Sequence, residues 1–293
     1  GYGAVSRKNL TTAIAQVKPE KIPQAATSNI SQLLMGRAAG LQAVVNSTQP
    51  DGKVNISIRG GENPIYVVDG IVMPGDAIST NGGETGLPSN VNRGGLAGLN
   101  PSDIESVEIL KDASAAIYGI GAANGVILIT TKKGKEGAPS ISYDGSYSFV
   151  RNYPYLDALN SQQYMELANV FNKENYLYNK KQYPYGPDAY DGKWSPLFSE
   201  TDRLNALDTN WKDYVLKSGY ITKHNLTISG GTSKIRYYLG GSYLDQEGTV
   251  LNSGMTKYTF RGNIGVDLFP FLNFTSAFNA NQNTYSNCMV GTD

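Results

Sequence analysis

The chain has 293 residues with 25 basic and 25 acidic side chains, and this zero net charge removes the electrostatic case for a nucleic-acid partner. Its single cysteine, Cys288, excludes an intrachain disulfide and a cysteine cluster for zinc or iron–sulfur. Gly and Tyr are abundant, at 33 and 20 residues, which is typical of β-structure with turns and aromatic belts. No apolar run approaches the roughly 18 residues of a transmembrane helix, so any spanning segment must be a strand of a closed barrel.

Residues 1–135 predict a compact mixed α/β domain. Apolar spacing and turn residues indicate a helix over 28–40, strands over 54–58 and 65–70, a helix start at Asn100–Pro101, a strand over 107–111, a small-residue helix over 113–118 and a strand over 125–131. Residues 74–99 are rich in Gly, Asn and Ser, and we expect them to form an exposed loop.

Residues 136–293 follow a different pattern, in which apolar and polar residues alternate as they do in strands. Five stretches show it: 141–149, 223–229, 234–243, 257–268 and 272–281. Their length of about ten residues suits tilted strands that cross a bilayer. The connections alternate between short and long, as periplasmic turns and extracellular loops do, with the longest over about 151–219. A soluble β-domain is the alternative interpretation of the same alternation.

Five strands cannot close around a domain of this size, because an open sheet edge is forbidden inside lipid. Barrels that hold a folded plug have about 22 strands. Neither end of the chain carries a signal peptide or has the character of a natural terminus. We therefore expect a piece of a longer protein, with most of the barrel beyond Asp293.

Four motifs carry a resemblance to a known family: Ile58–Gly60, Pro64–Gly70, Leu99–Gly119 and Asn124–Gly134. In this order and spacing they resemble the plug of the SusC/RagA-type TonB-dependent transporters. The run Lys234–Gly248 is similar to the early barrel strands of that family. The resemblance implies an α+β plug domain over 1–135, followed over 136–293 by antiparallel transmembrane β-barrel strands of an incomplete barrel.

The resemblance also implies a function: energy-coupled import of a large nutrient, most often glycan-derived, across the bacterial outer membrane. The implied partners are a SusD-like surface lipoprotein, the TonB–ExbB–ExbD complex, outer-membrane lipid and an oligosaccharide or other nutrient ligand. No bond is broken in such import, so we expect no enzyme activity, no catalytic residues, no cofactor and no metal.

Two plug cations, Arg59 and Lys111, match family positions that pair with barrel-wall carboxylates and lock the plug. The alternative is that both are ordinary solvated surface charges. Asp69 and Gly70 are better explained as a local turn. The remaining signature residues are also expected to be structural: Gly60, Asp112, Tyr118, Gly119, Asn124 and Gly125.

The long connection over 151–219 contains an amphipathic stretch at 161–171 and a group of aromatic residues: Tyr176, Tyr178, Tyr183, Tyr185, Tyr190 and Trp194. Aromatic faces stack on sugar rings and on partner proteins, and they also stabilise loops by packing on one another. All three roles stay open. His224, the only histidine, lies on the apolar phase of a strand, which argues against a zinc or Ser-His-Asp site.

Two other functions remain as alternatives. One is a siderophore or vitamin importer of the broader TonB-dependent class. The other is a non-transporting outer-membrane glycan-binding protein, which would need the alternating strands without a plug.

Overall fold

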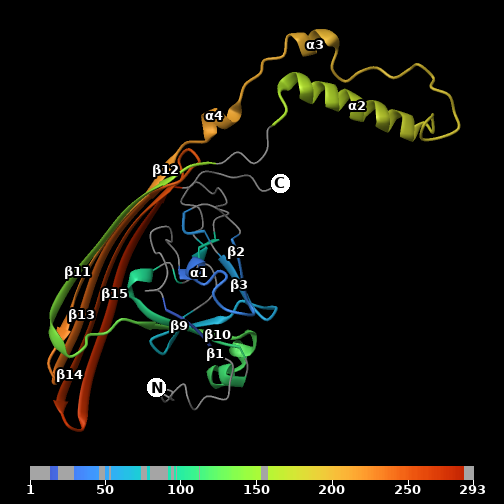
Figure 1. Cartoon of the computed structure of the whole chain (residues 1–293). Coiled ribbons are helices and arrows are strands. Elements are labelled where there is room, and N and C mark those ends of the chain that lie inside the picture. Colours follow the sequence, from blue (N-terminus) through green and yellow to red (C-terminus); the bar gives the residue numbers. More distant parts are fainter. Residues whose placement is uncertain are drawn as a thin grey trace. The chain divides into compact units, whose positions relative to one another are not determined.

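The structure is a computed structural model of the chain, and it describes residues 14–18, 30–45, 50–52, 54–73, 78–79, 92–93, 96, 98–111, 113–152 and 158–286. Contacts divide the chain into two units (Figure 1). The first combines Gly1–Arg151 with Ser218–Asp293, and the second is Asn152–Lys217. Asp112, one of the predicted signature residues, lies outside the described residues.

The N-terminal part of the first unit is built on a five-stranded mixed sheet, which we call the plug sheet. Its strands lie in the order β1 (Ile14–Val17), β9 (Ile104–Leu110), β10 (Val126–Thr131), β5 (Ile65–Val68) and β6 (Ile71–Met73). β10 runs parallel to β5, and the other neighbours are antiparallel. The predicted strands at 65–70, 107–111 and 125–131 are confirmed, with boundaries shifted by up to three residues.

Smaller elements surround the plug sheet. A three-stranded sheet consists of β2 (Leu41–Val45), β3 (Val54–Ile58) and β4 (Gly61–Glu62), and a separate strand pair consists of β7 (Ile78–Ser79) and β8 (Asn92–Arg93). The helical elements are α1 (Ile30–Leu33) and the 3-10 helices η3 (Pro101–Asp103), η4 (Ala113–Tyr118) and η5 (Ile120–Asn124). Two clusters of buried aliphatic side chains form the core. In the first, Ile30 and Leu34 pack with Ile109, Ile127 and Ile129, which joins α1 to the plug sheet.

Two local expectations were wrong in detail. The helix predicted over 28–40 is regular only over Ile30–Leu33 and continues as turns to Gly40, whose φ of +75° is a conformation that favours glycine. The stretch predicted as an exposed loop contains Leu96 and Leu99, which are 5% and 9% exposed. Both leucines pack in the main core.

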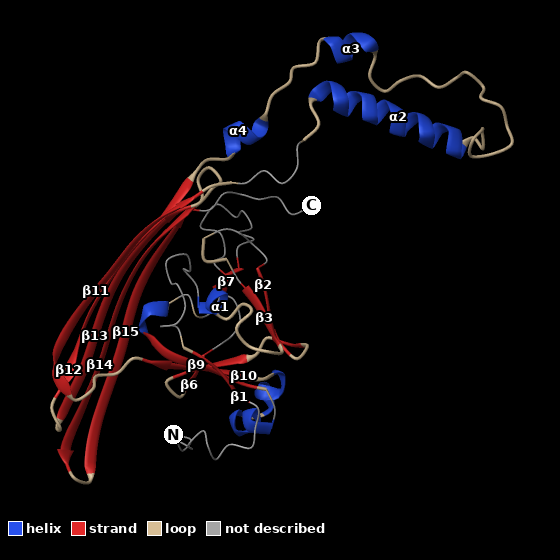
Figure 2. Cartoon of the chain, viewed as in Figure 1, coloured by secondary structure: helices blue, strands red, loops and turns tan. Residues whose placement is uncertain are grey.

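The C-terminal part of the first unit is an antiparallel sheet that we call the wall. Its strands lie in sequence order: β11 (Gly137–Val150), β12 (Gly219–Gly231), β13 (Ile235–Glu247), β14 (Gly254–Phe269) and β15 (Leu272–Ser286). The ladders are nearly continuous along the strands. All five predicted strands are confirmed, and each is 13 to 16 residues long. Figure 2 shows them as a curved sheet with the plug against its inner face.

The two faces of the wall have opposite character, because side chains alternate along a strand. The outer face carries exposed apolar residues such as Ile141, Phe149, Leu226 and Phe260. The inner face carries buried polar residues of β12 and β14: Lys223, Asn225, Lys257, Thr259, Arg261 and Asn263. Apolar residues outside and polar residues inside are the pattern of a membrane barrel, not of a soluble sheet with an apolar inner face.

The second unit, Asn152–Lys217, contains α2 (Ser161–Asn179), α3 (Glu200–Leu204) and α4 (Trp211–Val215). A capping box begins α2, in which the Asn160 side chain accepts from the backbone N–H of Gln163 and the Gln163 side chain accepts from that of Asn160. The predicted amphipathic stretch at 161–171 is therefore the first half of a longer helix, drawn in blue in Figure 2.

Among the described residues, no helix is long and apolar enough to cross a membrane.

Candidate functional site: the plug–wall interface

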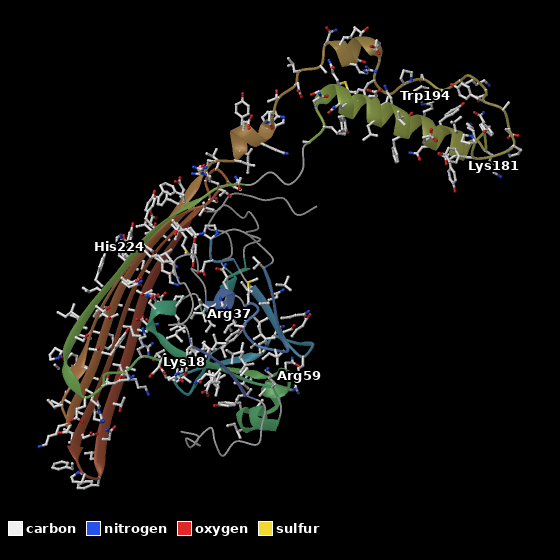
Figure 3. The ribbon with its side chains drawn as sticks, viewed as in Figure 1. Lys18, Arg37, Arg59, Lys181, Trp194 and His224 are labelled. Carbon is white, nitrogen blue, oxygen red and sulfur yellow. The ribbon has the colours of Figure 1, made fainter. Side chains whose placement is uncertain are left out.

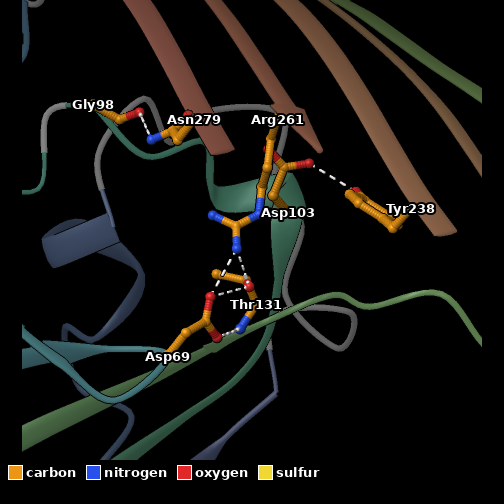
Figure 4. Close-up of polar contacts among 7 residues, drawn as sticks. All are labelled: Asp69, Gly98, Asp103, Thr131, Tyr238, Arg261 and Asn279. Carbon is orange, nitrogen blue, oxygen red and sulfur yellow. Dashed lines mark hydrogen bonds and ion pairs between the residues drawn. The ribbon is translucent and has the colours of Figure 1, made fainter. Parts of the chain in front are cut away.

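The plug and the wall meet at a partly buried ion pair. The Arg261 guanidinium of β14 donates from Nη2 to Asp69 Oδ2 of the plug at 2.7 Å, and the two side chains are 6% and 18% exposed. The same Nη2 contacts the Thr131 hydroxyl, which itself donates to Asp69 Oδ2 at 2.5 Å (Figure 4). Asp69 Oδ1 also accepts the backbone N–H of Thr131 at 3.0 Å. Both oxygens of the carboxylate are therefore occupied, as a buried charge requires.

Local backbone geometry places Asp69 at this point. Asp69 and Gly70 form the two-residue loop between β5 and β6, in which Val68 pairs with Ile71. Their φ angles are +49° and +89°, the left-handed pair that a tight hairpin needs and that Asp-Gly sequences favour. The hairpin ends at the edge of the plug, so the carboxylate reaches the wall without disturbing the core.

A second buried contact joins Asp103 at the start of β9 to Tyr238 of β13. The Tyr238 hydroxyl donates to Asp103 Oδ1 at 2.7 Å. Burial raises the pKa of Asp103 above its usual range, although the Tyr238 hydroxyl and the charge of Arg261 oppose that rise. Gly240 makes room for the contact, since a Cβ there would lie 2.9 Å from Asp103 Oδ1.

Four further hydrogen bonds extend the interface along the wall. Each joins a plug residue to β12, β14 or β15: Asn100 Nδ2 donates to Asn225 Oδ1 at 2.9 Å, Lys257 Nζ to Leu99 O at 3.3 Å, Asn279 Nδ2 to Gly98 O at 3.4 Å and the Tyr285 hydroxyl to Asp51 Oδ2 at 3.0 Å. Asn100 is held for this role by its own turn, because its Oδ1 caps the N–H of Ser102.

The segment that connects the plug to the wall, at Gly134, packs closely against the backbone of β13. Gly134 lies so close to β13 that a Cβ on it would sit 2.3 Å from the Tyr237 backbone nitrogen. Beside it, a cavity of about 400 Å³ is lined by Lys132, Lys133, Lys135, Glu105 and residues of β11 and β12. Only glycine fits at position 134 without displacing the backbone.

The two cations predicted to lock the plug lie elsewhere in the described structure. Arg59 occupies the turn between β3 and β4 with a φ of +51°, and Figure 3 places it on the side of the plug away from the wall. Lys111 Nζ donates to the carbonyl of Ala39, within the plug. Neither residue is brought to β11–β15, so a role of either residue as a lock stays a prediction.

The other signature residues lie in turns and packing positions of the plug. Gly60, Gly119 and Gly125 have φ angles of +86°, +87° and +95°. Asn124 Nδ2 donates to Glu62 O at 2.6 Å, and Tyr118 packs against the second core cluster.

The loop aromatics are engaged with their own unit. The Tyr176 hydroxyl donates to Asp191 at 2.7 Å, the Tyr185 hydroxyl donates to Glu174, and Trp194 Nε1 donates to Asn172 Oδ1 at 2.9 Å. Lys173 Nζ lies 5.6 Å from the ring centroids of both Tyr190 and Trp194. Tyr183 is 76% exposed. The Tyr178 ring packs edge-on against that of Tyr185, with the centroids 6.0 Å apart. This self-packing accounts for five of the six aromatic residues and leaves Tyr183 as the most available for an outside contact.

His224 lies on the outer face of the wall, as the strand pattern predicts, and its Nδ1 is 2.6 Å from the Tyr143 hydroxyl. Within the described ranges, no group of three or more His, Cys, Asp or Glu side chains could hold a metal ion.

Comparison with known proteins agrees with this architecture. The family model of the TonB-dependent Receptor Plug Domain matches residues 6–126. The TonB-dependent receptor SusC of Bacteroides thetaiotaomicron is 32% identical over 297 residues, a match that covers 98% of this chain and 26% of SusC. The chain belongs to the TonB-dependent receptors of the SusC/RagA type. This receptor chain thus spans about a quarter of the length of that curated relative.

Solved structures give the same fold. The RagAB peptide transporter matches with a TM-score of 0.68 and 25% identity, over 94% of this receptor chain and 31% of the solved chain. The siderophore receptor PirA from Acinetobacter baumannii matches with a TM-score of 0.54 and 18% identity, over 93% of this receptor chain and 32% of the solved chain. The second likeness shows the plug-and-strand fold alone. The family is one of receptors and transporters rather than enzymes.

Sequence reasoning missed the residues that join plug and wall. The local pattern explains Asp69 as a turn residue only, and it does not single out Arg261, Tyr238 or Lys257. A signal was present: the polar phase of β14 contains Lys257 and Arg261, and a charge that faces the inside of a filled barrel needs a partner. The partner itself is 192 residues away in sequence, and no local pattern reveals it.

Proposed function

We propose that this chain is the plug and the first part of the barrel of an importer that carries a large nutrient across the bacterial outer membrane. Residues 1–135 act as the plug and residues 136–293 as the beginning of the barrel. TonB, energised by ExbB–ExbD, pulls on the plug and remodels it, and a SusD-like surface lipoprotein covers the outer opening.

The observation that supports this proposal is the nature of the plug–wall contact. Among the described residues, the contact consists of the partly buried Asp69–Arg261 pair, the buried Asp103–Tyr238 pair and further single hydrogen bonds, and neither cluster of buried apolar side chains includes a wall residue. Polar contacts of this kind are specific in the closed state and are replaced by water once the surfaces separate, so the plug can move without exposing a large apolar surface.

We propose an oligosaccharide as the nutrient, in keeping with the resemblance to SusC. The relatives also include a peptide transporter and siderophore receptors, so the substrate class has to be tested directly.

The proposal is tested with a reversible cross-link between plug and wall in the protein expressed from its complete reading frame. A Cβ on Gly98 would lie 2.7 Å from Asn281 Nδ2, so cysteines at 98 and 281 have side chains within disulfide reach. The double variant Gly98→Cys/Asn281→Cys is made in a Cys288→Ser background. Growth of the source bacterium is measured on maltodextrins, on a pectin digest and, under iron limitation, on ferric enterobactin.

We expect growth on one of the oligosaccharides to require the protein, to stop when the double variant is oxidised and to return on reduction. Each single-cysteine variant should grow like the parent under both conditions. Growth that persists with the cross-link fully formed would show that the plug need not move. Dependence on ferric enterobactin alone would support the siderophore receptor instead.

A further inference from the structure

We infer that the part of the wall beneath the plug is a cationic lining, and that the cargo it admits is an oligosaccharide bearing carboxylate or sulfate groups. This inference rests on the proposed function, because it concerns the surface that is uncovered when the plug moves. It depends on charges of the plug and wall that face one another.

Three buried cations lie on the inner face of the wall, and two of them, Lys257 and Arg261, contact the plug directly. Lys223, Lys257 and Arg261 are 8%, 4% and 5% exposed, and all belong to the inner phase of β12 and β14. Lys223 and Lys257 share one row across the sheet, since each pairs with Leu244 of the strand between them. They are close enough to repel each other electrostatically.

Two of these cations, Lys257 and Arg261, face carboxylates of the plug, while Lys223 is opposed by Asp144 of the wall. Asp69 pairs directly with Arg261, Asp51 attracts Lys257, and Asp103 is attracted by Arg261. Asp51 and Asp103 are 2% and 6% exposed, so their charges are withdrawn from water together with those of the wall. In the closed state the plug therefore supplies the counter-charge of Lys257 and Arg261.

The wall cannot neutralise itself when the plug leaves. Among the described residues of β11–β15, the inner phase carries the cations Lys223, Arg236, Lys257 and Arg261 and the carboxylates Asp144 and Asp267. Arg236 is already paired with Asp267 at 2.7 Å. Asp144 balances the charge of one further cation. Four positive and two negative groups therefore leave an excess of two positive charges on the inner face.

The rest of the inner phase suits a hydroxyl-rich cargo. Asn279, Asn281 and Asn283 follow one another on the inner side of β15, next to Arg261, Thr259 and Lys257 of β14. Amide groups both donate and accept hydrogen bonds, as sugar hydroxyls require, while the cations select for negative charge. An acidic oligosaccharide satisfies both kinds of group, whereas a neutral one leaves the cations without partners.

The test is ion selectivity in planar lipid bilayers that contain the protein expressed from its complete reading frame. Urea in one chamber displaces the plug, and the reversal potential in a KCl gradient gives the permeability ratio of chloride to potassium. Current block by trigalacturonate, an acidic trisaccharide, is compared with block by neutral maltotriose.

We expect the open wild-type pore to favour chloride and to be blocked more strongly by trigalacturonate. The variant Lys223→Gln/Lys257→Gln/Arg261→Gln should lower the chloride preference by about twofold or more and remove the difference between the two sugars. Arg236→Gln/Asp267→Asn is the matched control, since it removes a cation together with its paired carboxylate and keeps the excess of two positive charges, and it should leave both measurements unchanged. Lys257→Arg/Arg261→Lys keeps the charges and should behave like wild type.

The outcomes separate the two proposals. If urea opens no conductance in wild type, the movable plug of the proposed function fails. If the conductance opens but the triple variant has the selectivity and sugar block of wild type, the cationic lining is overturned while the movable plug stands.

Discussion

The same chemical pair occurs twice in this molecule, in two different settings. At the plug–wall interface the Tyr238 hydroxyl donates to Asp103, and in the unit over 152–217 the Tyr176 hydroxyl donates to Asp191, both at 2.7 Å. The first pair is buried and the second is in solvent. Burial raises the pKa of Asp103, whereas the pKa of Asp191 is lowered, first by the N–H of Lys193 and then by Tyr176. The comparison teaches that the burial of a tyrosine–carboxylate pair, rather than the hydrogen bond itself, decides in which direction the pKa of the carboxylate moves.

The largest effect is expected from Arg261→Met, which removes the cation and keeps the bulk of the side chain. Asp69 would then be a partly buried charge without its ion-pair partner, at a cost of about 3 kcal/mol to plug docking, the lower end of the range for buried pairs. The urea concentration at which bilayer conductance appears should fall accordingly. Arg236→Met, in an exposed pair, is the control and should leave that concentration unchanged.

Tyr238→Phe should weaken docking by about 1–3 kcal/mol, because it leaves the buried Asp103 oxygen without a donor. Hydrogen exchange of β9 amides measures this as faster opening of the strand that Asp103 precedes. Exchange rates equal to those of wild type would show that water takes the place of the hydroxyl.

The stability contributions of Asp103 and Asp191 should change in opposite directions as the pH rises. For an acid whose folded pKa is raised, the proton stabilises the folded state, so the Asp103 contribution to docking is fully present below about pH 4 and is lost as pH rises through the raised pKa. For Asp191, whose pKa is lowered, the contribution is present above about pH 4 and is lost as pH falls through the lowered pKa.

Each contribution is measured as the difference in amide exchange between wild type and the matching variant, Asp103→Asn or Asp191→Asn, at each pH. Taking this difference cancels the effects of the other titrating groups. Amide exchange is followed in β9 for the first and in α2 for the second. If the wild-type-minus-variant difference changed with pH in the same direction for both residues, the opposite pKa shifts of Asp103 and Asp191 would be contradicted.

The smallest effect is expected from Tyr176→Phe. Its hydroxyl donates to Asp191, and that hydrogen bond raises the pKa of Tyr176 to about 12, yet both groups are solvated and water replaces the lost partner. Thermal unfolding followed by circular dichroism should be unchanged. A clear loss of helix signal from α2 would mean that the exposed network is more cooperative than its exposure indicates.

Prediction from sequence succeeded where a local rule decides the structure. The five wall strands were found because alternation has a period of two, and the turn at Asn100 was found because its side chain caps an N–H two residues later. Prediction stopped where distant segments meet. The burial of Leu96 and the pairing of Asp69 with Arg261 depend on how the plug packs within itself and against the wall, which no single stretch of sequence encodes.

The central claim is that paired charges hold the plug to the wall, and a double-mutant cycle on Asp69 and Arg261 tests it most directly. Asp69→Asn, Arg261→Gln and the double variant are compared by the urea concentration that opens the pore in bilayers. The account predicts that the double variant is weakened by clearly less than the sum of the singles, with a coupling of about 1–3 kcal/mol. Strict additivity of the two substitutions would contradict it.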